Sequence, residues 1–193
     1  MPPKPYHHGD LRQALIDATE EILTERGMEG FSMREAARRA GVSPAAPAHH
    51  FGDARGLLTA VATGAFLDLQ EALRAANAQG GESKPLHAQG RAYIDFGLAN
   101  PARFDLMWRC EALNRGDPAY LAASAGAFSL LHEAVTGLPV RPEQLCDDNK
   151  PGIDVRAVSA WSLVHGFTTL ARQGNVDPHM PGLIDGVLAA LAV

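Results

Sequence analysis

Cysteine is scarce in this chain of 193 residues, which contains only Cys110 and Cys146. Two cysteines are too few for the disulfide framework of a small secreted domain or for a four-cysteine metal site. The sequence also lacks an uncharged apolar run of about 18 residues, and its first residues carry no apolar core of a secretion signal. We therefore expect a cytoplasmic protein with no metal site and no membrane span.

An excess of positive charge is also absent. The chain has 17 Lys and Arg residues against 22 Asp and Glu residues, a net charge of −5. This balance excludes a protein that coats nucleic acid through its overall charge, so any DNA binding must be local. The first 56 residues, with seven basic and eight acidic residues and four of the eight histidines, are relatively more basic than the rest.

Signatures of common enzymes are missing as well. There is no His-Glu-x-x-His motif and no phosphate-binding glycine loop, and the histidine pairs at 7–8 and 49–50 have no carboxylate constellation beside them. Ser124-Ala125-Gly126 weakly resembles a nucleophile elbow, but that motif requires a strand before the serine, whereas Ser124 falls in a helical pattern. We expect neither enzymatic activity nor a cofactor.

Helical periodicity and helix-capping residues cover most of the chain, and no strand-like alternation competes with them. The pattern predicts an all-α protein, with an exposed loop over about 139–152. The expected helices run from Asp10 to Gly27, Met33 to about Ala40, Pro44 to Phe51, Asp53 to Gly80, through Tyr93 and Leu98, after Asn100-Pro101, from Pro118 to Gly137, from about Val155 to Gln173, and from about Pro181 to Val193.

Two short helices joined by Gly41-Val42-Ser43 have the proportions of a helix-turn-helix. In that geometry the start of the second helix enters the major groove, where small side chains approach the bases and histidines add hydrogen bonds. Pro47 predicts an irregular start to this helix, because proline lacks the backbone N–H of an early helical hydrogen bond. From spacing alone, a solvated corner of a helical bundle is the alternative.

Basic residues around this motif are candidates for phosphate contacts, which position a protein on DNA without specifying sequence. They include Arg38 and Arg39 on the first helix of the pair. The committed set of DNA-contacting candidates is Lys4, His7, His8, Ser32, Met33, Arg34, Ser43, Pro44, Ala45, Ala46, His49, His50 and Arg55.

The segment from Gly27 to Leu58 contains Phe31-Ser32-Met33-Arg34-Glu35-Ala36-Ala37, Gly41-Val42-Ser43 and His50-Phe51, and closely resembles the tetracycline-repressor (TetR) family. The resemblance implies an all-α homodimer whose first three helices bind operator DNA, usually as a repressor. We place the DNA-binding domain at residues 1–56 and an effector-binding and dimerisation domain at residues 57–193. The run from Trp161 to Gly166 also resembles the Trp-His-Gly class of C-terminal domain.

Two positions depart from the family pattern. Ala48 stands where the family usually has an aromatic residue, and Ala54 where it usually has a lysine; both usual residues contact phosphate. Their loss weakens the salt-dependent part of DNA binding. The alternative function is therefore a helical ligand- or protein-binding module of this family whose operator binding is weakened or lost.

The second domain carries large apolar residues and one histidine that are candidates for an effector pocket, with core packing as the alternative role for each. Trp161 and His165 are four residues apart and share a helix face, and Arg109 or Tyr93 could accompany His165. The last two helices are apolar enough to form a dimer interface. The pocket candidates are Tyr93, Phe96, Phe104, Met107, Trp108, Phe128, Trp161 and His165.

Overall fold

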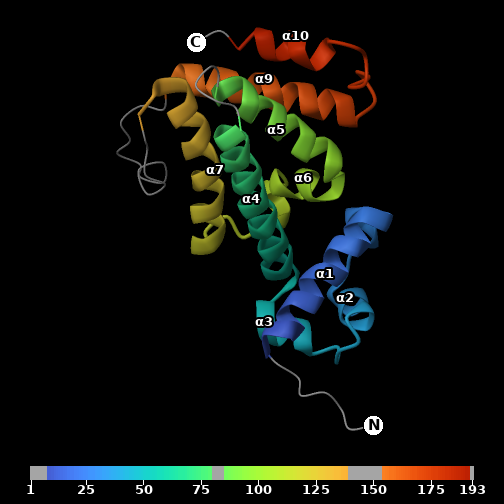
Figure 1. Cartoon of the computed structure of the whole chain (residues 1–193). Helices are drawn as coiled ribbons and strands as arrows, with labels where there is room; N and C mark the ends of the chain where they lie inside the picture. The colour runs from blue at the N-terminus through green and yellow to red at the C-terminus, as the bar shows by residue number, and fades with distance from the viewer. Residues whose placement is uncertain (1–7, 80–84, 139–153, 192–193) are drawn as a thin grey trace. The chain divides into compact units, whose positions relative to one another are not determined.

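The computed structural model describes residues 8–79, 85–138 and 154–191, without the side chains of residues 8–10 and 79. Within these ranges the chain is helical and forms no β-strand, which confirms the predicted all-α class (Figure 1). The helices are α1 (His8–Arg26), α2 (Met33–Arg39), α3 (Ala46–Phe51), α4 (Ala54–Gln79), α5 (Pro85–Ala99), α6 (Pro101–Met107), α7 (Pro118–Thr136), α9 (Val155–Arg172) and α10 (Leu183–Ala189).

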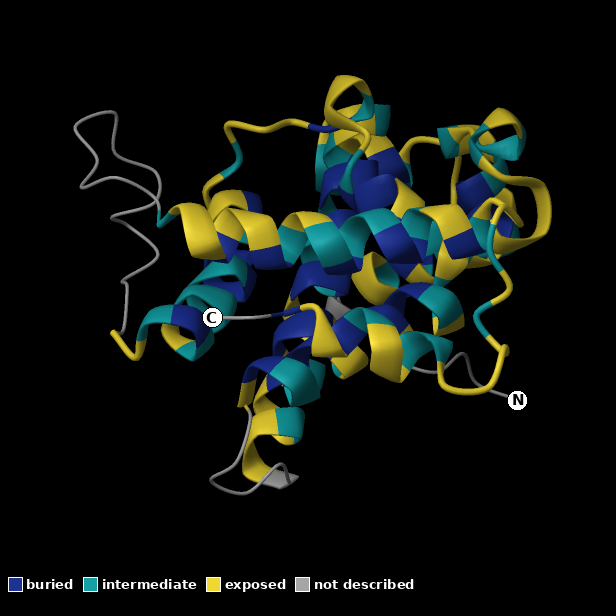
Figure 2. Ribbon diagram, turned by 90° about the horizontal axis from the view of Figure 1, so that it is seen from above, coloured by how far each residue is buried: buried dark blue, intermediate teal, exposed yellow. Residues whose placement is uncertain are grey.

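The chain divides into two compact units. The first combines Met1–Ala65 with Ala102–Tyr120, and the second combines Phe66–Pro101 with Leu121–Val193. Helices α4 and α7 therefore each supply residues to both units. The helices carry buried residues along one side and exposed residues along the other (Figure 2), as amphipathic helices around a core do.

The first unit is built on α1, whose Leu15 and Ile22 are fully buried at the predicted helical spacing. Ala36 and Ala37 of α2 are also buried, and such small side chains let two helices approach closely. At the start of α4 the approach of the backbone is closer still. A Cβ atom at Gly56 would lie 1.9 Å from the carbonyl oxygen of Phe51, so only glycine fits there.

The second unit packs α5 against α9, with α10 over both. Gly90 on α5 makes this possible, because a Cβ atom there would lie 2.7 Å from Leu188 and 3.1 Å from Leu191. Both leucines are buried within the protomer. The apolar face of α10 is thus used largely inside its own unit.

Several helix starts are confirmed, and others differ from the prediction. Asp53 and Asp117 accept backbone N–H groups of the helices that follow them, as expected of N-caps. Asp10 was wrongly predicted as a cap, since α1 already begins at His8. The last helix is shorter than predicted and begins after the left-handed Gly182. The predicted loop at 139–152, with Cys146, lies outside the described residues.

Helix α3 begins at Ala46 with Ala45 as its N-cap, two residues later than the predicted Ser43 cap. The reason lies in Pro47, which is buried and sits in the first turn of the helix. At that position a residue needs no N–H for the helical ladder, so proline is tolerated. An earlier start would move Pro47 into the helix interior, where its missing N–H would break the ladder.

Candidate functional sites

The helix-turn-helix is defined by local hydrogen bonds. The Ser32 hydroxyl oxygen accepts the Glu35 backbone N–H at 3.2 Å and caps α2. At the other end Gly41 adopts φ +68°, a conformation that favours glycine, and the Val42 N–H donates to the Ala37 carbonyl at 3.0 Å. The chain therefore reverses sharply between α2 and α3.

The surface formed by this turn and by α3 is small, polar and free of negative charge. Of the predicted base-contacting residues, Ser43, Pro44, Ala45 and His49 are exposed, and Ala46 and His50 are half-buried. No acidic residue occurs between positions 36 and 52. Because DNA repels carboxylates, such a surface is compatible with close approach to a duplex. We name this surface, Ser43–His50, the α3 surface.

The arginines of α2 fall into two groups. Arg39 is 12% exposed and lies in an ion-pair cluster with Glu25 and Glu35 that ties α2 to α1. Arg38 pairs with Glu35 at 2.7 Å, and these hydrogen bonds from Arg38 and Arg39 lower the pKa of Glu35 to about 2. Arg34, by contrast, is exposed, and no ion pair to it occurs in the described part of the chain.

The remaining predicted DNA contacts are spread differently. Ser32 is exposed and Met33 half-buried at the start of α2. Arg55 is exposed at the start of α4, and one of its N–H groups donates to the Leu113 carbonyl oxygen at 2.9 Å. Lys4, His7 and the side chain of His8 lie outside the described residues. Their predicted roles stay predictions, as do those of the α3 surface.

In the second unit the sequence brings four of the pocket candidates together. The Tyr93 hydroxyl lies 2.8 Å from His165 Nδ1, and the Trp161 indole N–H donates to the Tyr93 oxygen at 3.3 Å. The Phe128 ring packs edge-on against Trp161, with centroids 6.0 Å apart. We name Tyr93, Phe128, Trp161 and His165 the aromatic cluster.

The hydrogen bonds of this cluster assign its protons. An indole N–H can only donate, so the Tyr93 oxygen accepts from Trp161 and its own proton points to His165 Nδ1. This order places the proton of neutral His165 on Nε2. Burial lowers the pKa of His165 and raises the pKa of Tyr93, so both groups favour their uncharged forms.

The other pocket candidates are placed elsewhere. Phe96 is buried on α5 in the second unit, one turn beyond Tyr93. Phe104 and Met107 are 1% exposed and belong to the first unit, where Phe104 packs edge-on against Trp108. Arg109, the alternative companion of His165, is an exposed residue of the first unit.

A residue that the sequence reasoning missed is Gln89 of α5, which is 1% exposed. Its amide nitrogen donates to Asn77 Oδ1 and to the Leu130 carbonyl, at 3.0 and 3.1 Å. Its oxygen Oε1 is buried and has no hydrogen-bond partner within the residues that the structure describes. The available signal was a glutamine four residues before Tyr93, on the same apolar helix face.

Two kinds of site were sought without result in the described ranges. No group of three His, Cys, Asp or Glu side chains there is arranged to hold a metal ion. No helix there combines the length and apolar character needed to cross a membrane.

Comparison with known families gives two matches. Residues 15–61 match the family described as bacterial regulatory proteins, tetR family. Residues 86–192, more than half of the chain, match the family described as Tetracyclin repressor-like, C-terminal domain. The Trp-His-Gly class stays a prediction, since neither description specifies it.

Individual relatives agree with these matches. The HTH-type transcriptional regulator BetI 1 of Chromohalobacter salexigens is 38% identical over 84 residues, which cover 44% of this chain and only 41% of that regulator. A protein of unknown function from Rhodococcus sp. RHA1 is 34% identical, with a TM-score of 0.75 over 97% of this chain and 94% of its own. The multidrug binding protein EbrR, solved in complex with ethidium, shares the fold at 18% identity, with a TM-score of 0.68 over 96% of this chain and all of its own.

Proposed function

Since the chain belongs to the tetR family of bacterial regulatory proteins, we propose that it regulates transcription, binding a palindromic operator as a homodimer and changing its DNA affinity when a small molecule binds. Family membership confirms the resemblance noted in the sequence. We assign operator binding to residues 1–56 and effector binding and dimerisation to residues 57–193, with repression of cytoplasmic transcription as the expected outcome.

The observation that carries the DNA-binding part is the α3 surface. It is exposed, follows a capped helix-turn-helix, and has no carboxylate in or beside it, although the chain as a whole is acidic. Apolar and hydroxyl contacts from Ser43 to Ala46 would read base edges, and His49 would add hydrogen bonds. Exposed Arg34 would hold a backbone phosphate.

The second candidate function is a family member with weakened operator binding that acts through ligands or protein partners. The observation favouring it is the pair Ala48 and Ala54, which offer no group to a phosphate where the family pattern has one. Arg55 also spends one N–H on the Leu113 carbonyl. Operator selection separates the two candidates.

Effector binding is assigned to the interior of the second unit, where the aromatic cluster and Gln89 lie. A buried acceptor without a donor costs about 1–3 kcal/mol, which an effector with an N–H or O–H group would recover at Gln89 Oε1. The rings of Phe128 and Trp161 would pack against a planar apolar body. Structural relative EbrR binds ethidium, a ligand of this general shape.

Homodimerisation is assigned to α9 and α10. Val155, Val158, Ser162, Gly166 and Leu170 recur on α9 at spacings of three and four residues, so they share a face, and the three apolar side chains among them are 38–73% exposed. A Cβ atom at Gly166 would meet nothing within 4 Å in the protomer. Glycine inside a helix destabilises it, so a second copy of α9 lying close at this position would account for its presence.

The test is selection of bound sequences from random duplex DNA by the purified protein, at low and moderate salt. We expect a palindromic consensus at both salt concentrations. As a matched pair, Arg34→Gln should weaken binding to all sequences and reduce its salt dependence, whereas Arg91→Gln in the second unit should do neither. Selection without enrichment at either salt would favour the second candidate.

A further inference from the structure

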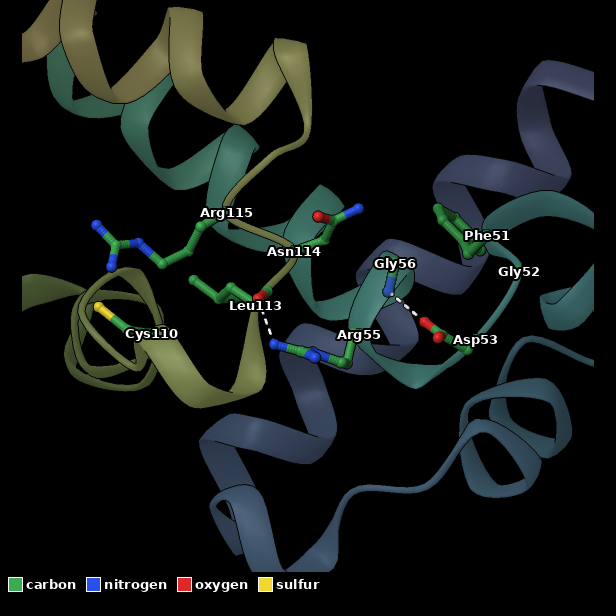
Figure 3. Close-up of a pocket in the computed structure, with 9 residues that line it drawn as sticks. All are labelled: Phe51, Gly52, Asp53, Arg55, Gly56, Cys110, Leu113, Asn114 and Arg115. Carbon is green, nitrogen blue, oxygen red and sulfur yellow. Dashed lines mark hydrogen bonds between the residues drawn. The ribbon is translucent and has the colours of Figure 1, made fainter. Parts of the chain in front are cut away.

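A cleft of about 490 Å³ opens in the first unit, separate from the aromatic cluster of the second. One wall is the end of α3 and the first turn of α4, and the other is the segment that leads to α7 (Figure 3). Its volume is within the range of about 300–1,000 Å³ typical of small-molecule sites. The proposed function gives this cleft no role.

The walls of the cleft carry positive charge that the protein does not neutralise. Arg55 and Arg115 both line it, one on each wall, and neither forms an ion pair in the part of the chain that the structure describes. The single carboxylate on the walls, that of Asp53, is engaged as the α4 cap, accepting the Gly56 N–H at 2.9 Å. The arginines therefore dominate the local potential.

The Arg55 guanidinium is held in place by the chain itself. One of its N–H groups donates to the carbonyl oxygen of Leu113, a fully buried residue of the opposite wall (Figure 3). A guanidinium has five N–H donors, so most of them remain to bind an oxyanion. This contact fixes one cationic group before any ligand arrives, which reduces the entropy that binding must overcome.

Cys110 adds a reactive group to the same cleft. Its thiol is free and the residue is exposed on the wall that carries Arg115. Burial raises the pKa of Tyr120 most, while Cys110 raises it further and Arg115 lowers it, so both groups lie near the Tyr120 hydroxyl. Cys110 thus reports directly on what occupies the cleft.

We propose that this cleft is a second ligand site, which binds a small organic anion with a carboxylate or phosphate group. Arg55 and Arg115 hold the anionic group, because guanidinium groups bind planar oxyanions with paired, charge-assisted hydrogen bonds. Phe51 and Leu113 contact the apolar part of the ligand. An occupant would touch the last residue of α3 and the 110–115 segment together.

The experiment measures alkylation of Cys110 by neutral iodoacetamide in the full chain carrying Cys146→Ser, which leaves one thiol. Succinate, inorganic phosphate and duplex DNA are titrated separately, with sodium chloride at matched ionic strength as the control. We expect saturable slowing by succinate, by phosphate or by both, and the more effective anion identifies the group recognised. Protection by DNA alone would overturn the proposal, because the arginines would then serve as DNA phosphate contacts.

Paired variants separate a site from general charge. Arg115→Gln should raise the anion concentration needed for half-protection by about tenfold, the effect of losing one charge-assisted hydrogen bond. Arg109→Gln, which removes the same charge next to Cys110 but not from the cleft wall, should leave it unchanged. Equal effects of the two variants, or no anion protection beyond that of sodium chloride, would contradict the site. Unchanged circular dichroism verifies folding of each variant.

Discussion

The two units handle polar groups in opposite ways. In the first, charges lie at the surface and the buried polar side chains are satisfied: Thr19 bonds within its helix, and Thr59 also accepts the Asn114 N–H. In the second, neutral polar groups lie inside, and Gln89 Oε1 has no partner in the described residues. A buried acceptor of this kind is a place where a ligand can act, whereas surface charge suits a polyanion.

The outer surfaces also differ. The exposed apolar residues of the second unit include a stripe on α9, whereas the α3 surface of the first unit is polar and small. An apolar stripe of this kind favours a permanent partner, and a polar one favours a partner that dissociates. The division of labour proposed above therefore follows from surface chemistry as well as from family membership.

The largest expected effect comes from blocking the α9 stripe. Gly166→Leu should convert the dimer to a monomer and weaken binding to a palindromic duplex by about 100-fold or more, because two linked half-site contacts become one. Gly166→Ala is the matched control: it adds a single methyl and removes the helix penalty of glycine. Analytical ultracentrifugation with fluorescence anisotropy gives both readouts. A dimer that persists in Gly166→Leu would place the interface elsewhere.

A smaller effect is expected from restoring the two family phosphate contacts in the first unit. Ala48→Tyr with Ala54→Lys should tighten DNA binding by about tenfold and make its salt dependence steeper by about 0.9 per added contact. Ala75→Lys, exposed further along α4, adds charge without a contact. Operator affinity measured over a salt series decides the question. An unchanged slope in the double variant would contradict the placement of these residues on the DNA.

The second unit should respond to pH through His165, whose pKa is lowered by burial. The stability this provides is present above the ordinary histidine pKa of about 6.5 and is lost as the pH falls through that value towards the folded one, because the unfolded chain binds the proton more readily. His165→Gln should therefore flatten the decline in unfolding free energy between about pH 7 and 5. Urea unfolding measures it, with exposed His179→Gln as control. An identical decline in both variants would show that His165 does not titrate on unfolding.

The sequence predicted the local part of this architecture. Caps at Ser32, Asp53 and Asp117 act on N–H groups two or three residues away, so they can be recognised from spacing. The start of α3 was missed because the proline at position 47 outweighs the Ser-Pro signal before it. That competition depends on how the whole turn packs.

Contacts between distant residues were predicted less well. Arg39 was expected to hold a phosphate, but its ion pair with Glu25, 14 residues away, depends on how α1 crosses α2. Tyr93 and His165 are 72 residues apart, and the sequence could only offer Tyr93 and Arg109 as alternatives. Gln89 was missed because its unpaired oxygen is a property of the folded interior.

The smallest expected effect on stability, and the sharpest on the proposed division of roles, belongs to Gln89. Gln89→Met keeps the side-chain volume, removes the unpaired oxygen and gives up two hydrogen bonds, so the unfolding free energy should change by less than about 1.5 kcal/mol. Operator affinity should be unchanged, because no residue of the first unit is touched. Binding of ethidium, followed by its fluorescence, should weaken if Gln89 serves an effector. Full retention of ethidium binding in Gln89→Met would assign this glutamine to the packing of α4, α5 and α7.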